Sequence, residues 1–230
     1  MGKLIRANEF YRCKFIESIT LSHGLTEIGE SAFYACRNLK NVGIPETVTK
    51  IGPHAFRYSG LKSIILPHGL TEIGESAFYY CVNLENVVIP ETVTKIGPWA
   101  FAYSGLKSII LPDGRLTEIG KHTFYDCHNL ETVVIPDSVT KIGPEAFACS
   151  GLKSIILPYQ SKGLTEIGDD TFRSCRNLET IVIPNSVTKI GRCAFTDSGL
   201  KSIILPPDRL IKIGEDAFRN CRNLTVEYKN

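Results

Sequence analysis

The stretch that decides the fold runs from residue 70 to residue 112 and consists of two related segments. Residues 70–90 read LTEIGESAFYYCVNLENVVIP, and residues 93–112 read VTKIGPWAFAYSGLKSIILP. Both segments contain Ile-Gly, a Phe four residues after the Gly, then a Leu and an apolar run that ends at Pro. The pair recurs along the chain, because residues 25–69 and 70–114 are identical at 38 of 45 aligned positions. Self-similarity at a fixed period is the signature of a repeat architecture.

Phenylalanine marks the repeat from one end of the chain to the other. Ten of the 11 Phe residues lie 22–25 residues apart, and only Phe15 falls outside the register. A single coil cannot bury its own apolar face, so neighbouring coils must stack, which predicts a solenoid. We expect one solenoid domain over residues 1–230, with ten coils centred on Phe10, Phe33, Phe56, Phe78, Phe101, Phe124, Phe147, Phe172, Phe195 and Phe218.

One coil can be interpreted residue by residue. Leu84, Val87 and Ile89 fall at inward positions, and Val88 falls between them at an outward one. This alternation predicts a strand of about four residues. Pro90 ends the strand, because proline cannot donate a hydrogen bond to a sheet. Stacking the coils would then align these strands in a parallel sheet.

The segment around each Phe has the features of a helical turn. The Ile-Gly is followed by Pro in one type of coil, and Pro is tolerated at the first position of a helix. In the other type of coil an acidic residue follows, which suits the positive end of a helix dipole. In nine coils the residue before the strand Leu is Asn or Gly, the types that accept left-handed backbone best. We therefore expect a short helical turn that ends at that residue.

Composition excludes several classes of protein. The 26 Lys and Arg residues nearly balance the 24 Asp and Glu residues, leaving a net charge of +2. This lacks the basic excess that binding to nucleic acid or to an anionic membrane requires. The 19 Gly and 12 Pro residues are spread along the whole chain and interrupt long helices and membrane spans. We expect no nucleic-acid partner, no membrane insertion and, from residues 1–6, no signal peptide.

The residues that usually carry chemistry do not assemble into a site. Alternate coils place a Cys at one position, and these lie roughly 10 Å apart, farther than the roughly 7 Å that a disulfide allows. Most are therefore expected to be buried free thiols, while Cys149 is either free or paired with Cys127 or Cys175. His122, Cys127 and His128 offer three zinc ligands but lack the fourth of a tetrahedral set. No catalytic motif occurs, so we predict no catalytic residue, no metal, no cofactor and no small-molecule substrate.

Charges alternate along two columns of the predicted stack. The residue after the strand Leu runs Lys62, Glu85, Lys107, Glu131, Lys153, Glu179, Lys201. The residue before Ile-Gly runs Glu27, Lys50, Glu72, Lys95, Glu118, Lys141, Glu166, Lys189. Stacking would place opposite charges side by side, and a slip by one coil would place like charges together. The alternative interpretation is a solvated charged face without a role in register.

The string L-x-x-I-G-x-x-A-F-x-x-C-x-x-L-x-x-[I/V]-x-I-P, which covers about residues 4–228, resembles the BspA-type or Treponema pallidum-type leucine-rich repeat. The resemblance implies an α/β repeat: a right-handed solenoid with a parallel sheet on its concave side and short helical turns on its convex side. Many such proteins are bacterial or protozoan surface proteins implicated in adhesion and host-protein binding. The resemblance therefore implies an extracellular or cell-surface location and a protein partner.

Outward strand positions form the candidate binding face. One column is polar, and its neighbour is aliphatic, which is unusual on an exposed sheet. The functional interpretation is contact with a protein partner or self-association, and the alternative is that β-branched residues simply stabilise strands. The candidate residues are Ser63, Ile65, Asn86, Val88, Ser108, Ile110, Thr132, Val134, Ser154, Ile156, Thr180 and Val182.

Two further features lie outside the strands. Trp99 occupies a position that other coils fill with residues such as His54, Glu145 and Cys193, so it is expected at the surface as a contact anchor or as a laterally packed side chain. Tyr159, Gln160 and Lys162 belong to a longer loop after a strand, which is either an unselected insertion or part of a binding edge. The leading hypothesis is a non-enzymatic interaction or adhesion module. The alternative is an engineered or duplicated scaffold without a ligand of its own.

Overall fold

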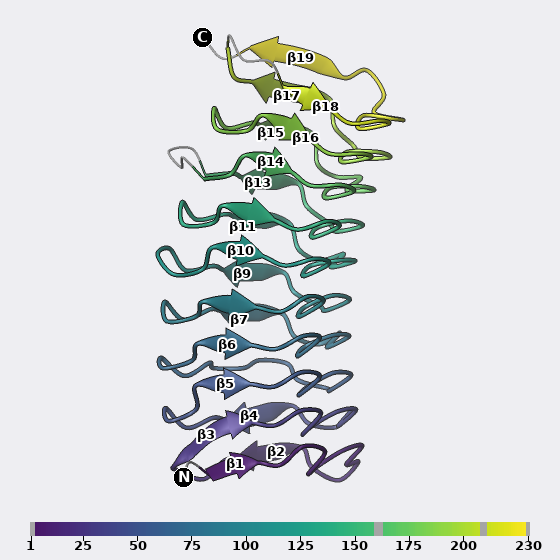
Figure 1. The fold of residues 1–230 in the computed structure, drawn as a ribbon. Coiled ribbons are helices and arrows are strands. Elements are labelled where there is room, and N and C mark those ends of the chain that lie inside the picture. The colour runs from purple at the N-terminus through teal and green to yellow at the C-terminus, as the bar shows by residue number, and fades with distance from the viewer. Residues whose placement is uncertain (1–2, 159–162, 208–210, 229–230) are drawn as a thin grey trace.

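The computed structural model describes residues 3–158, 163–207 and 211–228. The chain winds into a stack of flattened coils, with the N-terminal coil at one end and the C-terminal coil at the other (Figure 1). The coils contribute strands to two sets of parallel pairings, which we call the first sheet and the second sheet, except that the coil around Ser63 joins the second sheet only through one bridge. The segments that follow the first-sheet strands form the turn edge of the stack, and the loops that follow the second-sheet strands form the proline edge (Figure 1).

The first sheet is built from the segment that contains Ile-Gly. Its pairing runs β1-β3-β5-β6-β8 and then β10-β12-β14-β16-β18, always parallel. The strands are β1 (Lys3–Ile5), β3 (Leu25–Ile28), β5 (Lys50–Ile51), β6 (Glu72–Ile73), β8 (Lys95–Ile96), β10 (Glu118–Ile119), β12 (Lys141–Ile142), β14 (Glu166–Ile167), β16 (Lys189–Ile190) and β18 (Lys212–Ile213). This sheet was not expected, because the sequence pattern predicts only one strand in each coil, at residues 84–89 and their equivalents.

The second sheet is the one that the sequence predicts. Its pairing runs β2-β4, β7-β9, β11-β13 and β15-β17-β19, with a single bridge between Ser63 and Asn86. The strands are β2 (Ser18–Thr20), β4 (Asn41–Gly43), β7 (Asn86–Val88), β9 (Ser108–Ile110), β11 (Thr132–Val134), β13 (Ser154–Ile156), β15 (Thr180–Val182), β17 (Ser202–Leu205) and β19 (Thr225–Tyr228). Leu84, Val87 and Ile89 are buried as predicted, with Val88 exposed between them.

The number of turns differs from the ten coils expected. Over the described residues the first sheet holds ten strands, from β1 to β18. The chain makes one full turn between each first-sheet strand and the next. Ten strands are separated by nine such intervals, so the stack has about nine turns. The difference arises because the number of Phe residues gives the passes through the core, not the full turns between them.

A continuous row of phenylalanine rings forms the centre of the core. The rings of successive coils stack face to face, with centroids 5.0–5.8 Å apart from Phe10 to Phe218. The eight rings from Phe33 to Phe195 are fully buried. Stacked aromatic pairs add stability beyond their buried area. This row confirms that the Phe period is the period of the stack.

The expected helical turns are absent from the described part of the chain, where the turn edge is a series of tight turns instead. The N–H groups of Ser31, Phe33 and Ala35 donate to carbonyl oxygens of the next coil, at 2.7–2.9 Å. The intervening N–H groups of Ala32 and Tyr34 donate to the carbonyl oxygens three residues earlier and so close four-residue turns within the coil. An α-helix needs every N–H for its own i−4 carbonyl, so this alternation between coils excludes it.

The left-handed backbone also falls elsewhere than predicted. In each coil it occurs two residues before and two residues after the Phe, for example at Trp99 (φ 60°) and Tyr103 (φ 57°). Of the Asn and Gly residues that precede the strand Leu, Asn223 alone among the described ones has a positive φ. Gly is required at that position for a different reason, which is the close approach of the neighbouring coil. A Cβ at Gly151 would overlap the carbonyl oxygen of His128 in the preceding coil.

Candidate functional site

The outer face of the second sheet carries an unbroken row of exposed aliphatic side chains, which we call the aliphatic face. The exposed fraction of the residue is 84% at Ile65, 60% at Val88 and 61% at Ile110. Successive members are aligned by the parallel register, since Val88 pairs with Ile110. The complete row is Ile65, Val88, Ile110, Val134, Ile156 and Val182.

A polar column runs beside the aliphatic face on the same strands. Asn86 pairs in register with Ser108, whose hydroxyl donates to the Asn86 Oδ1 at 2.7 Å. Thr132 pairs in the same way with Ser154. The column is Ser63, Asn86, Ser108, Thr132, Ser154 and Thr180, and these residues are exposed. The structure therefore brings the twelve predicted strand residues together on one face, and their role in binding stays a prediction.

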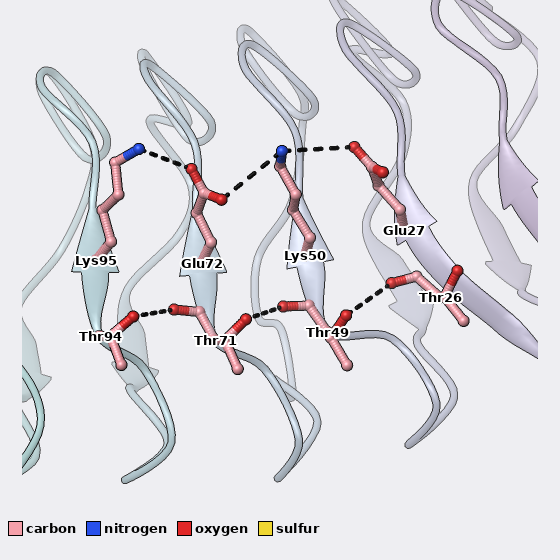
Figure 2. Close-up of polar contacts among 8 residues, drawn as sticks. All are labelled: Thr26, Glu27, Thr49, Lys50, Thr71, Glu72, Thr94 and Lys95. Carbon is pink, nitrogen blue, oxygen red and sulfur yellow. Dashed lines mark hydrogen bonds and ion pairs between the residues drawn. The ribbon is translucent and has the colours of Figure 1, made fainter. Parts of the chain in front are cut away.

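The outer face of the first sheet, which we call the threonine face, is bonded from coil to coil. The hydroxyl of Thr71 donates to the Thr49 carbonyl at 3.0 Å, and the hydroxyl of Thr94 donates to the Thr71 carbonyl at 3.2 Å (Figure 2). The same bond recurs at 3.3 Å between Thr140 and Thr117. Each hydroxyl thus reinforces a backbone bond between the same two coils.

Acidic and basic side chains form ion pairs beside these threonines. Lys50 lies between Glu27 and Glu72, at 3.9 and 3.7 Å, and Lys95 lies 2.9 Å from Glu72 (Figure 2). The hydrogen bond from Lys95 lowers the pKa of Glu72 below its ordinary value. Farther along, Lys141 contacts Glu118 at 2.7 Å. The predicted alternation is therefore realised as ion pairs between coils.

The second charged column, beside the second sheet, forms separate pairs. Lys107 lies 2.9 Å from Glu85, and Lys153 lies 2.7 Å from Glu131. No ion pair joins Lys62 to Glu85 among the described residues. This column is therefore less continuous than the sequence predicts.

Trp99 is half-buried and packs laterally. Its ring stacks on His122 with centroids 3.7 Å apart and also contacts Tyr79 and Tyr125. The His122 Nε2 lies 3.0 Å from Glu145, and burial lowers the pKa of the imidazole despite that carboxylate. Of the two interpretations of Trp99, the geometry favours lateral packing over an exposed anchor.

Sequence reasoning missed an aromatic surface along the turn edge. Tyr58 contacts Tyr34 edge-on at 5.7 Å and Tyr80 at 5.3 Å, while the Arg57 guanidinium lies 4.2 Å above the ring of Tyr79. These residues occupy variable positions of the repeat, and only the abundance of Tyr next to the core Phe could have indicated them. The aromatic residues of this edge are Tyr11, Tyr34, Tyr58, Tyr79, Tyr80, Trp99, Tyr103 and Tyr125.

The loop candidates Tyr159, Gln160 and Lys162 lie outside the described residues. Their proposed part in a binding edge therefore stays a prediction.

The cysteines are free. The Cys81 thiol is buried, donates to the Phe56 carbonyl at 3.1 Å, and has its pKa raised by burial to about 12. Cys149 is half-buried and free, so the alternative of a disulfide with Cys127 or Cys175 is not realised. A buried thiol with a raised pKa is a poor nucleophile and a poor metal ligand.

The histidines considered as metal ligands have other partners. His122 contacts Glu145, and the His128 Nε2 lies 2.9 Å from Asp126. No group of three or more His, Cys, Asp or Glu side chains in residues 3–158, 163–207 and 211–228 is placed to hold a metal ion. Within the same residues, no helix has the length and apolar character needed to cross a membrane.

Comparison with family models identifies one match. Residues 3–115, 71–198 and 159–226 match the BspA type leucine rich repeat region, which that model describes as six copies. The three matched ranges overlap and together extend over nearly the whole chain. No curated protein matches the chain.

Solved structures of bacterial leucine-rich repeat proteins resemble the fold. A leucine-rich repeat protein from Bacteroides ovatus is 30% identical with a TM-score of 0.71, covering 96% of this chain and 69% of its own. One from Eubacterium ventriosum is 22% identical with a TM-score of 0.52, covering 94% and 79%. The T. pallidum leucine rich repeat protein is 22% identical with a TM-score of 0.48, covering 96% and 71%.

Proposed function

Because the chain belongs to the BspA-type leucine-rich repeat family, we propose that it is a protein-interaction module whose aliphatic face contacts a protein partner. Leucine-rich repeat proteins commonly act at surfaces or in protein interactions, and the fold is typically non-enzymatic. The cell-surface location and the adhesive role implied by the resemblance belong to this proposal.

The observation that carries the proposal is the exposure of the aliphatic face. Ile65, Ile110 and Ile156 expose 61–84% of their residue surface in one row. Burying an Ile side chain contributes roughly 1.5–3 kcal/mol relative to leaving it exposed. Large exposed apolar patches are uncommon on monomers and mark interaction surfaces. A partner that covered several members of this row would therefore gain substantial free energy.

A second candidate function is a spacer or scaffold without its own ligand. The regularity of the ion pairs and of the aliphatic face favours it, since interaction hot spots are usually enriched in Trp, Tyr and Arg. The polar and aliphatic columns of the second sheet contain none of these from Ser63 to Val182. The two candidates predict different behaviour in solution.

The test is a triple variant, Ile110→Lys/Val134→Lys/Ile156→Lys, compared with the natural sequence by light scattering after size exclusion and by binding to serum and extracellular-matrix proteins. We expect a partner captured by the natural protein, or a self-associated state, to be lost in this variant. The matched control is Thr117→Lys/Thr140→Lys/Thr165→Lys on the threonine face, which should retain the interaction. If the unsubstituted protein is monomeric and captures no partner, the result would support the scaffold instead.

A further inference from the structure

Two adjoining hollows open on the turn edge near the N-terminal end of the stack. The larger has a volume of about 580 Å³ and the smaller about 390 Å³. Arg37 and Tyr58 line both hollows, which therefore adjoin at these two residues, and we call the pair of hollows the N-terminal groove. The larger hollow is lined by Arg12, Lys14, Tyr34, Ala35, Arg37, Asn38 and Tyr58. The smaller is lined by Arg37, Tyr58, Ser59, Gly60, Tyr80, Val82 and Asn83.

The larger hollow gathers three cations without a carboxylate. Arg12, Lys14 and Arg37 are exposed, and none of them forms an ion pair with a described residue. Elsewhere on the turn edge, Arg173 lies 2.9 Å from Asp170, the Arg57 guanidinium lies over the ring of Tyr79, and Arg176 lines a hollow that also contains Asp126. Unpaired guanidinium and ammonium groups that line one concavity attract an anion and can form charge-assisted hydrogen bonds with it.

The smaller hollow combines the aromatic and aliphatic side chains of Tyr58, Tyr80 and Val82 with polar groups from Arg37, Ser59 and Asn83. Tyr80 exposes 46% and Val82 exposes 52% of their surfaces there. The backbone of Tyr58 and Tyr80 is left-handed, with φ of 60° and 58°. Bulky residues rarely accept this conformation, and the equivalent position of a later coil holds Asp126. The backbone therefore does not require tyrosine at these positions. The rings pack against one another, as Tyr58 does on Tyr80 at 5.3 Å, and present an aromatic surface to the hollow.

The charge of the groove changes along its length. One position of the repeat lies four residues after the core Phe, next to a Cys or Ser. It holds Lys14 and Arg37 in the first two coils, and Gly60 and Val82 in the next two. Cations thus occupy one end of the groove and apolar side chains the other. A sulfated or uronic-acid polysaccharide repeats its anions and would require cations along the whole length. A short peptide that places an acidic group beside an apolar side chain matches the observed order.

We propose that the N-terminal groove binds a short protein segment that carries an acidic group next to an aromatic or aliphatic side chain. The acid lies among Arg12, Lys14 and Arg37, and the apolar side chain packs over Tyr80 and Val82. This site is on a different surface from the aliphatic face, so it does not depend on the proposed function above. Failure of either proposal leaves the other standing.

The test uses a peptide labelled with fluorescein at its N-terminus, fluorescein-Gly-Gly-Ser-Asp-Glu-Phe-Ile-Ser-amide, titrated with the full chain and followed by anisotropy at low and high salt. Two control peptides replace Asp-Glu by Lys-Lys or Phe-Ile by Ser-Ser. We expect binding of the first peptide that weakens with salt, and weaker binding of both controls. Charge-assisted hydrogen bonds are strong enough that losing the acid should weaken binding about tenfold or more.

Protein variants locate the site. Arg12→Asn/Lys14→Ser/Arg37→Ser should weaken binding about tenfold or more, and Tyr80→Asn/Val82→Ser should weaken it severalfold. Asn is used at the left-handed positions because it tolerates that backbone. Arg176→Ser is the matched control, since it occupies the same position of the repeat in a later coil. If the triple variant fails to fold by circular dichroism, Arg37→Gln alone carries the test.

Three outcomes would overturn the proposal. The Lys-Lys peptide could bind as well as the acidic one, or the arginine and lysine variant could bind as tightly as the natural protein. A heparin-derived oligosaccharide could bind the groove while the acidic peptide does not, which would assign the site to an anionic glycan.

Discussion

The threonine face and the aliphatic face belong to the same coils, yet the side chains of one are bonded to neighbouring coils and those of the other are exposed to solvent. On the threonine face, Thr71 bonds to the preceding coil and Lys95 pairs with Glu72. On the aliphatic face, Val88 and Ile110 project into solvent beside their aligned neighbours. The polar groups of one face are satisfied within the stack, whereas the apolar groups of the other are left uncovered.

This difference indicates how a solenoid can separate stability from recognition. Bonds between coils are made where Thr, Glu and Lys repeat on the first sheet. The second sheet is held by its backbone pairing, by the buried side of its strands and by side-chain bonds in the columns beside the aliphatic face, such as that of Ser108 to Asn86. The exposed aliphatic side chains themselves are therefore free to change. Substitutions should therefore lower stability on the threonine face and alter binding on the aliphatic face.

The largest expected effect comes from Gly151→Ala, which tests whether both faces depend on the same close approach of coils. The added Cβ would overlap the His128 carbonyl oxygen, so the coils must separate or shift. Overpacking of this kind costs roughly 3 kcal/mol. Urea unfolding followed by circular dichroism should show a large decrease in the midpoint.

The control for that variant is Gly69→Ala in a loop of the proline edge. A Cβ there would meet its nearest neighbour, the Glu46 carbonyl oxygen, at 3.4 Å, an ordinary contact. We expect a change within about 1 kcal/mol of the natural protein. Equal midpoints for the two variants would show that close approach at the turn edge does not set the spacing of the coils.

A smaller effect is expected from Lys95→Glu/Lys141→Glu, which places like charges together along the threonine face. Each exposed pair contributes about 0.2–1 kcal/mol and like charges cost a similar amount, so the loss should be roughly 1–3 kcal/mol at low salt. Thermal melting should show a deficit that shrinks as salt is added, because salt screens exposed charges.

Lys95→Gln/Lys141→Gln separates attraction from repulsion, since it removes the pairs without adding like charges. We expect it to cost less than the Glu variant. Equal melting temperatures for the Gln and Glu variants, at every salt concentration, would remove charge repulsion as a determinant of register.

Much of the fold follows from the sequence because its determinants repeat. The Phe period gives the stacking of the rings, and Leu84, Val87 and Ile89 give the buried side of the second sheet. The first sheet could not be predicted in the same way. Its two-residue strands, such as β8 (Lys95–Ile96), are too short to show an alternation, and their partners lie in other coils.

The backbone conformation of the turn edge could not be predicted from the preferences of its residue types, for a related reason. Trp99 and Tyr103 take left-handed backbone although neither type favours it, because hydrogen bonds between coils fix their conformation. The columns of the aliphatic face were predictable, since they follow from strand alternation. The N-terminal groove was not, because Arg37, Tyr58 and Val82 come from three coils and lack a shared motif.

The smallest expected effect isolates one hydrogen bond and compares the two faces directly. Thr71→Val keeps the shape of the side chain but removes the hydroxyl that donates to the Thr49 carbonyl. That carbonyl still accepts the backbone N–H of Thr71 at 2.8 Å, so the cost should be about 0.5–1 kcal/mol. The reverse change on the aliphatic face, Val88→Thr, removes no hydrogen bond and should stay within about 0.5 kcal/mol of the natural protein. Urea midpoints measured on both variants decide the matter: if Val88→Thr costs as much as Thr71→Val, the aliphatic face also holds the coils together.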